Sequence, residues 1–438
     1  MKTNFEKKVA NWGNYPFVKK KIVAEEDYGK IREFLKNHNE VIARGNGRCY
    51  GDAALGEAIF STKKLNKFIS FDRINGVLEC ESGVLLSEIL EVIVPQGYFL
   101  AVTPGTKFVT LGGAIASNIH GKNHHAEGNF SECVLEFNIM IENGEILTCS
   151  REENTDKFWS TMGGMGLTGI ILSAKIKLRN IETAYIRQES IKADNLDEIF
   201  HLFEESEDWT YTVAWIDCLQ KGKNIGRSIL LRGEFALRAE LTGKVAENPL
   251  RIKKKINPTI PFYFPGFVLN SLSIKAFNFL YFNKQRKKNQ QKMVDYETFF
   301  YPLDFINNWN KIYGKGGFIQ YQMVIPKDKG KEGMSKILET IGRSGQGSFL
   351  AVLKLFGKNN PEAYNSFPFE GYTLALDFKV NRQLVQLVSN LDKIVEEFGG
   401  RIYRTKDSMS KSSLTNYLKN TESSKFVSLQ SKRIARGS

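Results

Sequence analysis

Short apolar runs separated by turn signals fill the first part of the chain and predict β-strands. Asn75-Gly76 and Asn143-Gly144 each have the composition of a tight hairpin turn. Leu85 to Val94 has instead an apolar pattern typical of a helix, which Pro95 would end. The expected strands occupy residues 40–43, 68–71, 77–80, 137–141, 145–148 and 167–178.

The pattern changes after about Glu182. A basic and aromatic stretch lies between Leu250 and Lys292, and residues 318–378 again have the pattern of a sheet. A chain of 438 residues is too long for one ordinary domain. We therefore expect two domains, or one domain that carries a large insertion.

The formal net charge of +13 requires an acidic partner, which could be nucleic acid, an anionic membrane surface or a phosphorylated ligand. The five cysteines include no CxxC pair, which argues against a zinc site or a disulfide framework and fits a reducing compartment. Residues 1–12 lack the apolar core of a secretory signal, and no window reaches the ~20 apolar residues of a spanning helix. We therefore expect a cytoplasmic or peripherally membrane-associated protein.

The first candidate site is the loop from Arg44 to Asp52, which follows an expected buried strand. Its three closely spaced glycines would let backbone amides approach a ligand. Arg44 and Arg48 add positive charge suited to a diphosphate. Taken alone, the loop also fits a glycine-rich hairpin with solvated arginines.

A second candidate segment covers residues 104–125. The small residues at 112–117 leave room for a flat or extended ligand against the backbone. Three of the five histidines fall within 120–125, but no cysteine or carboxylate is interleaved, so we expect no metal site. Residues 164–169 match GxGxxG, yet an expected helix precedes them and a strand follows, which is the reverse of a dinucleotide-binding motif.

Together these motifs resemble the vanillyl-alcohol-oxidase-type (PCMH-type) FAD-binding family, and more narrowly the oxidase subunits of decaprenylphosphoryl-β-D-ribose 2-epimerase. The run from Ile119 to His125 is the most specific part of the likeness, which extends from about Trp12 to about Arg433. The motifs that carry it occupy residues 44–52, 104–106, 112–116, 119–125, 166–171, 214–217, 301–304, 320–326, 354–357, 377–378 and 399–408.

The resemblance implies an α+β fold, in which a PCMH-type FAD-binding domain carries an inserted substrate domain built on an antiparallel sheet. The expected boundaries are 1–182 for the FAD-binding domain, 183–399 for the substrate-binding domain and 400–438 for a C-terminal return to the FAD domain. Many relatives bind flavin covalently through a histidine of the first loop. Here that segment reads Tyr50-Gly51-Asp52, so FAD is expected to be held non-covalently. The implied cofactor contacts are Ala43, Arg44, Gly45, Asn46, Gly47, Arg48, Cys49, Tyr50, Gly51, Asp52, Ala53, Gly105, Thr110, Leu111, Gly112, Gly113, Ser117, Asn118, Ile119, His120, Ile171 and Tyr403.

The chemistry implied by the resemblance is FAD-dependent oxidation of the 2′-hydroxyl of a polyprenyl-phosphoryl-β-D-ribose to a ketone. This is the first half of epimerisation to arabinose for cell-envelope glycan synthesis. A quinone-like acceptor would reoxidise the flavin, and a short-chain-type NAD(P)H-dependent reductase would complete the epimerisation. The implied catalytic residues are Lys406, His120 and Tyr50. A cation such as Lys406 would stabilise the negative charge that hydride transfer creates, while either His120 or Lys406 could be the base.

The resemblance also assigns a substrate face, on which the best-known relatives carry a cysteine at the position of Ala375. For a lipid-linked substrate, the basic stretch from Leu250 to Lys292 suits an anionic bilayer, and no nucleic-acid readout module is visible. Two other interpretations stay open here: a soluble aldonolactone or alditol oxidase that uses oxygen, and a basic binding protein with a vestigial flavin fold. The implied substrate contacts are Trp215, Phe300, Gln320, Gln322, Lys354, Thr373 and Asp377.

Overall fold

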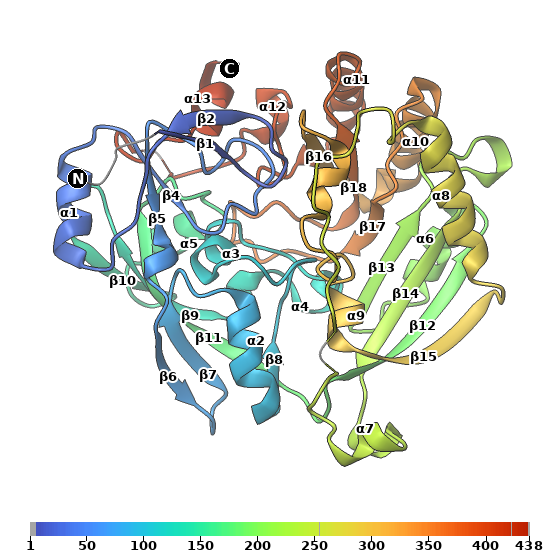
Figure 1. Cartoon of the computed structure of the whole chain (residues 1–438), viewed down its shortest axis with the longest axis horizontal. Helices are drawn as coiled ribbons and strands as arrows, with labels where there is room; N and C mark the ends of the chain where they lie inside the picture. Colours follow the sequence, from blue (N-terminus) through green and yellow to red (C-terminus); the bar gives the residue numbers. More distant parts are fainter. Residues whose placement is uncertain (1–5, 254, 422, 437–438) are drawn as a thin grey trace.

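The computed structural model describes residues 6–253, 255–421 and 423–436. The chain forms two halves that lie side by side, each built on a large antiparallel sheet with helices packed against it (Figure 1). This arrangement confirms the α+β class that the family resemblance implies.

The N-terminal half contains three sheets. Its elements are β1 (Lys7–Ala10), β2 (Phe17–Lys20), β3 (Ile22–Val23), α1 (Tyr28–Lys36), β4 (Val41–Arg44), β5 (Ala58–Ser61), β6 (Phe68–Asp72), β7 (Val77–Glu81), α2 (Leu86–Ile93), β8 (Tyr98–Leu100), α3 (Leu111–Ala116), α4 (His124–Glu127), β9 (Val134–Met140), β10 (Ile146–Ser150), α5 (Thr155–Thr161) and β11 (Ile170–Asn180). The largest sheet has six strands in the order β10-β9-β11-β7-β6, with β8 paired to β11. The strands β3-β5-β4 form a small parallel sheet, and β1-β2 form a hairpin.

The local elements of this half agree with the apolar pattern. The expected strands are confirmed as β4, β6, β7, β9, β10 and β11, and the expected helix is confirmed as α2. Pro95 lies in the 3-10 turn that follows α2. Gly76 and Gly144 adopt φ values of 60° and 84°, the left-handed conformation that their hairpin turns require. The GxGxxG segment at 164–169 indeed lies after helix α5 and before strand β11.

The second half contains one sheet of eight strands in the order β15-β12-β14-β13-β17-β18-β16-β19. Its elements, with those of the C-terminal segment, are β12 (Tyr185–Ala193), α6 (Leu196–Glu204), β13 (Tyr211–Ile216), β14 (Ser228–Phe235), α7 (Lys244–Glu247), α8 (Ser271–Lys284), β15 (Asn289–Asp295), α9 (Tyr296–Phe300), β16 (Phe318–Pro326), α10 (Gly330–Ser344), β17 (Ala351–Phe356), β18 (Gly371–Lys379), α11 (Leu384–Glu397), β19 (Arg401–Ile402), α12 (Ser412–Thr415) and α13 (Leu429–Arg436). Helices α6, α10 and α11 bury their apolar residues against one face of this sheet.

The C-terminal segment returns to the N-terminal half. It leaves from β19, which pairs with β16 at the edge of the eight-stranded sheet. The Val41 N–H then donates to the Lys425 carbonyl at 2.7 Å, and the Val427 N–H donates to the Val41 carbonyl at 2.9 Å. The division of the chain at 1–182, 183–399 and 400–438 stays a proposal, which the two separate large sheets and this return support.

Candidate active site

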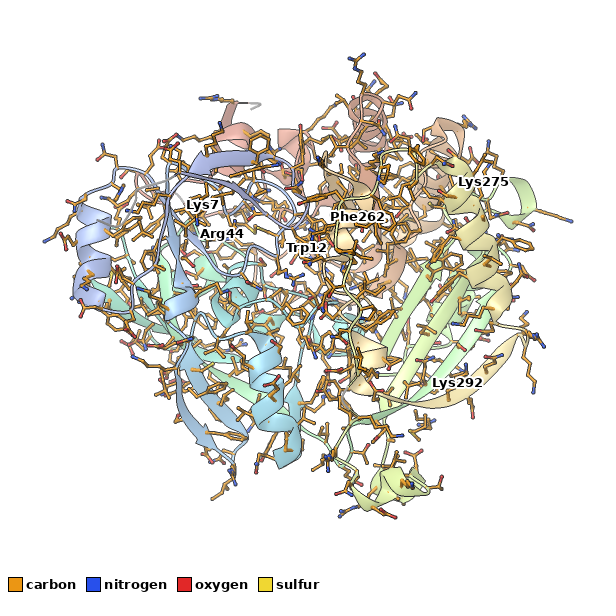
Figure 2. All side chains as sticks on the ribbon, viewed as in Figure 1. Lys7, Trp12, Arg44, Phe262, Lys275 and Lys292 are labelled. Carbon is orange, nitrogen blue, oxygen red and sulfur yellow. The ribbon has the colours of Figure 1, made fainter. Side chains whose placement is uncertain are left out.

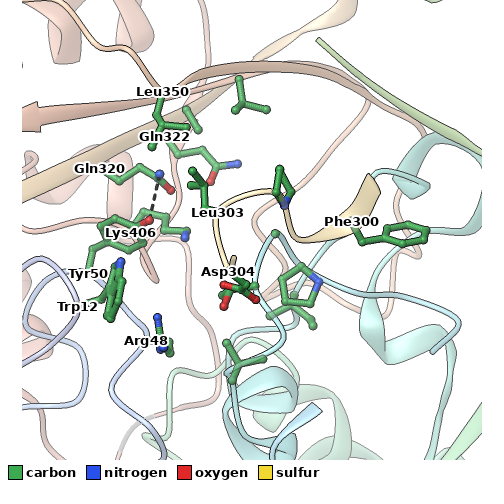
Figure 3. Close-up of a pocket in the computed structure, with 18 of the residues that line it drawn as sticks. Trp12, Arg48, Tyr50, Phe300, Leu303, Asp304, Gln320, Gln322, Leu350 and Lys406 are labelled. Carbon is green, nitrogen blue, oxygen red and sulfur yellow. Dashed lines mark hydrogen bonds between the residues drawn. The ribbon is translucent and has the colours of Figure 1, made fainter. Parts of the chain in front are cut away.

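One continuous cavity of about 1170 Å³ lies between the loops of the N-terminal half and the face of the eight-stranded sheet that α6, α10 and α11 leave open. Strand periodicity explains why polar side chains of β16 line this cavity, because successive side chains of a strand point to opposite faces. On β16, Tyr321 and Met323 pack into the helix-covered core, so Gln320 and Gln322 point into the cavity (Figure 3).

The neighbouring strands β17 and β18 follow the same alternation. Lys354 and Thr373 are cross-strand partners, and Gln320 is the partner of Asp377. Lys354 lines the cavity, whereas Thr373 and Asp377 lie one layer behind it. Gln322 Nε2 donates to Thr373 Oγ1 at 3.2 Å, and Gln320 Nε2 donates to Asp377 Oδ1 at 2.6 Å. The two buried side chains therefore fix the amides that face the cavity.

The loop after β4 forms the opposite wall of the cavity. Within the described residues, the backbone N–H groups of Asn46, Gly47 and Arg48 donate no hydrogen bond. Gly47 has a φ of +62°, and the Arg48 guanidinium carbon lies 3.8 Å from the centroid of a Trp12 ring. Unpaired N–H groups in a tight loop form a concave binding surface for anions. The loop has the chemistry needed to hold a diphosphate.

Small residues keep the wall beside this loop open. A Cβ at Gly45 would lie 2.1 Å from Thr110 Oγ1, and one at Gly112 would lie 2.9 Å from Ser82 Cβ. Gly105 faces open space, since a Cβ there would meet no atom within 4 Å. These glycines allow backbone to line a cavity that side chains would otherwise fill, which suits a large planar cofactor such as a flavin.

Lys406 and Tyr50 lie side by side in the cavity wall, although the sequence separates them widely (Figure 3). Lys406 Nζ lies 4.1 Å from the centroid of the Tyr50 ring, and it forms no hydrogen bond among the described residues. The Tyr50 hydroxyl accepts a 3.3 Å hydrogen bond from Gln320 Nε2. Burial lowers the pKa of Lys406 to about 8, although the Asp377 carboxylate opposes that shift. Burial also raises the pKa of Asp377 to about 7.

His120 is held by partners on both ring nitrogens. Lys354 Nζ lies 2.8 Å from His120 Nδ1, and Gln322 Nε2 lies 3.2 Å from His120 Nε2. Burial, together with the nearby Lys354, lowers the pKa of His120 well below its usual value. The imidazole is therefore neutral at physiological pH, with its orientation fixed.

The cavity brings most of the expected site residues together. The expected substrate contacts Trp215 and Phe300 lie in its wall, and so does Ala375, where relatives carry a cysteine. All three expected catalytic residues line it as well. The expected cofactor contacts that line it are Ala43, Gly45, Asn46, Gly47, Arg48, Cys49, Tyr50, Ala53, Gly105, Thr110, Gly112, Gly113, Ser117, Ile119, His120, Ile171 and Tyr403.

The structure places the other five expected cofactor contacts outside the cavity wall. Arg44 packs its guanidinium against Gly47 from behind the loop and donates to Asn11 and to the Ala10 carbonyl. Asp52 forms an ion pair with Arg433 of the C-terminal helix. The remaining three are Gly51, which packs under the Asp407 carbonyl, Leu111, which is in the core, and Asn118, which bonds to Ser131 and Ser366.

The sequence did not single out several residues that line the cavity. Trp12 covers Arg48, and no local pattern indicated this contact between distant segments. Lys122 and Asp304 stood inside the quoted motifs, but a loop pattern does not tell which way a side chain points. Asp304 Oδ2 accepts a hydrogen bond from the Lys107 N–H at 2.8 Å, which stabilises the loop beside the cavity.

Across the part of the chain that the structure describes, no group of three or more His, Cys, Asp or Glu side chains is placed to hold a metal ion. None of the helices in residues 6–253, 255–421 and 423–436 combines the length and the apolar character needed to cross a membrane.

Residues 24–150 match the FAD binding domain family. The chain is 39% identical over 84% of its length to decaprenylphosphoryl-β-D-ribose oxidase of Mycolicibacterium smegmatis, covering 80% of that protein. It is 27% identical over 74% of its length to an uncharacterised protein of Streptomyces coelicolor, covering 89% of that protein. It is also 26% identical to mouse L-gulonolactone oxidase, but over only 39% of the chain and 40% of that enzyme.

Proposed function

Because the chain belongs to the FAD-dependent decaprenylphosphoryl-β-D-ribose oxidase family, we propose that it oxidises the 2′-hydroxyl of a polyprenyl-phosphoryl-β-D-ribose to the 2′-keto sugar. The observation that carries the choice of substrate is the two-part character of the cavity. Polar side chains line the cavity beside Lys406 and His120, while Val213, Trp215 and Leu231 form an apolar floor farther along the same sheet. A polar sugar joined to an apolar lipid matches this division.

The cofactor site fits FAD. The unpaired N–H groups of the loop at 45–48 would hold the diphosphate, and the glycine-rich wall at 105–113 would pack near the flavin. Bound FAD supplies the hydride acceptor for alcohol oxidation. Among the described residues that line the cavity, His120 is the histidine present, and both of its ring nitrogens have partners. This supports non-covalent attachment.

Lys406 is our choice for the base. Its amine has no hydrogen-bond partner among the described residues and faces the cavity, whereas His120 is engaged on both sides. A pKa of about 8 is close to the working pH, as an efficient base requires. Lys406 Nζ would take the proton of the 2′-hydroxyl, and the resulting ammonium would stabilise the negative charge that accompanies hydride transfer. Tyr50 would position the amine, and Gln320 holds Tyr50.

The competing activity is a soluble aldonolactone or alditol oxidase that uses oxygen. The similarity to L-gulonolactone oxidase covers less than half of either chain, so it does not extend over the whole substrate-binding half. The apolar floor of the cavity also has no role with a small polar substrate. Both observations favour the lipid-linked sugar.

We also propose two partners from the chemistry of the product. A 2′-keto sugar becomes arabinose only when a hydride is delivered to the opposite face, so a short-chain-type NAD(P)H-dependent reductase would act next. A quinone-like acceptor would take the electrons, because a lipid-soluble oxidant reaches the same membrane as the substrate.

A lipid-linked substrate requires contact with a membrane, and the region around α8 has a suitable surface. Leu272, Phe279 and Leu280 on α8 are 78%, 58% and 67% exposed. Phe262 and Lys275 lie on the same side of the molecule, in the basic stretch that starts at Leu250 (Figure 2). Lys254 of that stretch lies outside the described residues. Exposed apolar side chains among lysines suit an anionic bilayer better than nucleic acid. We propose peripheral membrane binding through this surface.

Substituting Phe279→Asp and Leu280→Asp together is expected to weaken binding to vesicles that contain anionic phospholipid by about tenfold or more, because two inserted apolar side chains are lost. Co-sedimentation with the vesicles measures it. Val385→Asp is the matched control, since Val385 is an exposed apolar residue on α11. Equal binding by the double variant and the wild type would refute this membrane surface.

The proposed function is tested by the spectrum of the purified chain. We expect a yellow protein that releases FAD into the supernatant on acid precipitation, and whose colour bleaches anaerobically with farnesylphosphoryl-β-D-ribose. Colour in the acid pellet would disprove non-covalent binding. Bleaching by an aldonolactone with release of peroxide, and none by the lipid-linked sugar, would favour the soluble oxidase.

A further inference from the structure

None of the five lysines that line the cavity has a carboxylate partner among the described residues, and two of them, Lys122 and Lys354, lie close to His120 in the chain or in space. Lys122 Nζ donates to the Phe300 carbonyl at 3.1 Å and lies 5.6 Å from the ring centroids of Phe299 and Phe300. Lys354 Nζ contacts His120 and donates to the Gly121 carbonyl at 3.1 Å. Each side chain therefore keeps hydrogen-bonding capacity toward the cavity, since a protonated lysine has three donors.

The surroundings of this pair carry an excess of positive charge. Burial lowers the pKa of Lys122 to about 8, and burial with the neighbouring Lys122 and Lys406 lowers the pKa of Lys354. Asp377, which lies one layer behind the cavity, is engaged by Gln320 and Tyr313, and Asp304, which lines it, accepts from the Lys107 N–H. The lowered pKa values show that the ammonium forms are unfavourable here without an anion, and a bound anion would stabilise them.

We propose that Lys122 and Lys354 bind the phosphodiester of the lipid-linked sugar. This inference rests on the proposed function and names the groups that recognise the link between sugar and lipid. The phosphate would accept hydrogen bonds from both ammonium groups. Because Lys354 also holds His120 in place, phosphate binding fixes the sugar beside the reaction centre.

The geometry of the sheet selects this pair over Lys292. Lys284 and Lys292 also line the cavity, and Lys292 lies near the outer edge of the eight-stranded sheet (Figure 2). From β17, which carries Lys354, the sheet continues through β13, β14 and β12 to β15, which carries Lys292. These four steps amount to about 19 Å at ~4.8 Å per strand. In the substrate, the phosphate is attached through oxygen to C1′, and the reacting carbon is the adjacent C2′. The phosphate therefore cannot reach Lys292 while the sugar reacts.

The assignment also gives the direction of the lipid. Between Lys354 and Lys292, the face of the sheet that lines the cavity carries Val213, Trp215, Ile229 and Leu231, on β13 and β14. Phe277 and Tyr281 of α8 line the same part of the cavity, and the Tyr281 ring lies 4.7 Å from that of Trp215. An isoprenoid chain leaving the phosphate would follow this apolar passage beneath α8 toward the exposed apolar residues of the same helix.

Equilibrium binding to the FAD-loaded protein tests the site without turnover. Farnesyl phosphate and farnesol are titrated by calorimetry into the wild type, Lys122→Met and Lys292→Met. We expect Lys122→Met to weaken farnesyl phosphate binding by about 10- to 100-fold, as loss of a charged hydrogen bond predicts, and to leave farnesol binding unchanged. Lys292→Met, the matched control at the far end of the cavity, should bind both like the wild type. Equal FAD content shows that each variant is folded.

Three results would overturn the proposal. Equal weakening of farnesol and farnesyl phosphate by Lys122→Met would mean that Lys122 does not recognise phosphate. Weakening by Lys292→Met alone would place the phosphate at the outer edge. Inorganic phosphate that binds as tightly as farnesyl phosphate, and through Lys122, would make this a site for the free anion. If phosphoryl-ribose lipids fail to bleach the flavin while Lys122-dependent farnesyl phosphate binding persists, the proposed function is wrong and the phosphate site stands.

Discussion

Replacing Lys406 with alanine is expected to slow anaerobic bleaching of the flavin by the lipid-linked sugar by about 10²- to 10⁴-fold, the usual contribution of a positioned base. The substitution removes the one cavity amine, among the described residues, whose Nζ forms no hydrogen bond and which contacts the Tyr50 ring. Stopped-flow absorbance at saturating substrate measures the reduction rate. FAD content should not change, because the substitution leaves the loop at 45–48, the proposed diphosphate site, unaltered.

The pH dependence of the same rate distinguishes a base from a permanent cation. Because burial lowers the pKa of Lys406 to about 8, the neutral amine is the minor form at pH 7 and dominates above pH 8. The wild-type rate should therefore rise with pH through about 8 and then level off, while the alanine variant shows no such step. A rate that falls above pH 8 would assign Lys406 the role of a cation only.

The control for this substitution is Lys411→Ala. Lys411 lies in the same C-terminal return but is exposed, with an ion pair to Glu396 of α11. Its loss should change the reduction rate by less than about twofold, since exposed ion pairs contribute little. A Lys406→Ala variant that bleaches as fast as Lys411→Ala would remove Lys406 from the catalytic machinery.

Arg433→Ala is expected to lower the free energy of unfolding by about 3–5 kcal/mol, the usual cost of leaving buried carboxylates without their cation. Arg433 Nε and Nη2 each donate to the Asp52 carboxylate at 2.9 Å, and Nη2 also donates to Asp407 Oδ2 at 2.6 Å. The side chains of Asp52 and Asp407 are only 5% and 0% exposed. Removing the guanidinium would leave two acidic groups close together without water. Denaturant unfolding followed by flavin fluorescence measures the loss.

This variant should also bind FAD more weakly, because Asp407 follows Lys406 in the turn that packs against the first loop. That turn is held by the Tyr50 N–H, which donates to the Thr405 carbonyl at 3.1 Å. Arg436→Ala, at the exposed end of the same helix, is the matched control and should shift stability by no more than about 0.5 kcal/mol. Equal stability of the two variants would show that the Asp52–Arg433–Asp407 contact does not anchor the C-terminal segment.

The sequence determined the local elements and the family. Strands, hairpin turns and helix α2 follow from apolar periodicity and turn residues, which act over a few positions. The motifs indicated an FAD-binding chain, and the similarity to decaprenylphosphoryl-β-D-ribose oxidase confirms that family. The resemblance assigned Gln320 and Gln322 to the substrate face, and on β16 they do share a face, since residues two apart on a strand must do so.

Only the tertiary structure decided which groups meet. Lys406 reaches Tyr50 and Gln320 because the C-terminal return crosses back over the first loop, and no local pattern encodes that crossing. Arg44 and Arg48 looked equivalent in sequence, yet one turns to Asn11 and the other lines the cavity under Trp12. Lys122 gave no separate signal, because the direction of a loop side chain depends on the packing around it. Secondary structure follows from interactions between near neighbours, whereas the site results from burying apolar surface over the whole chain.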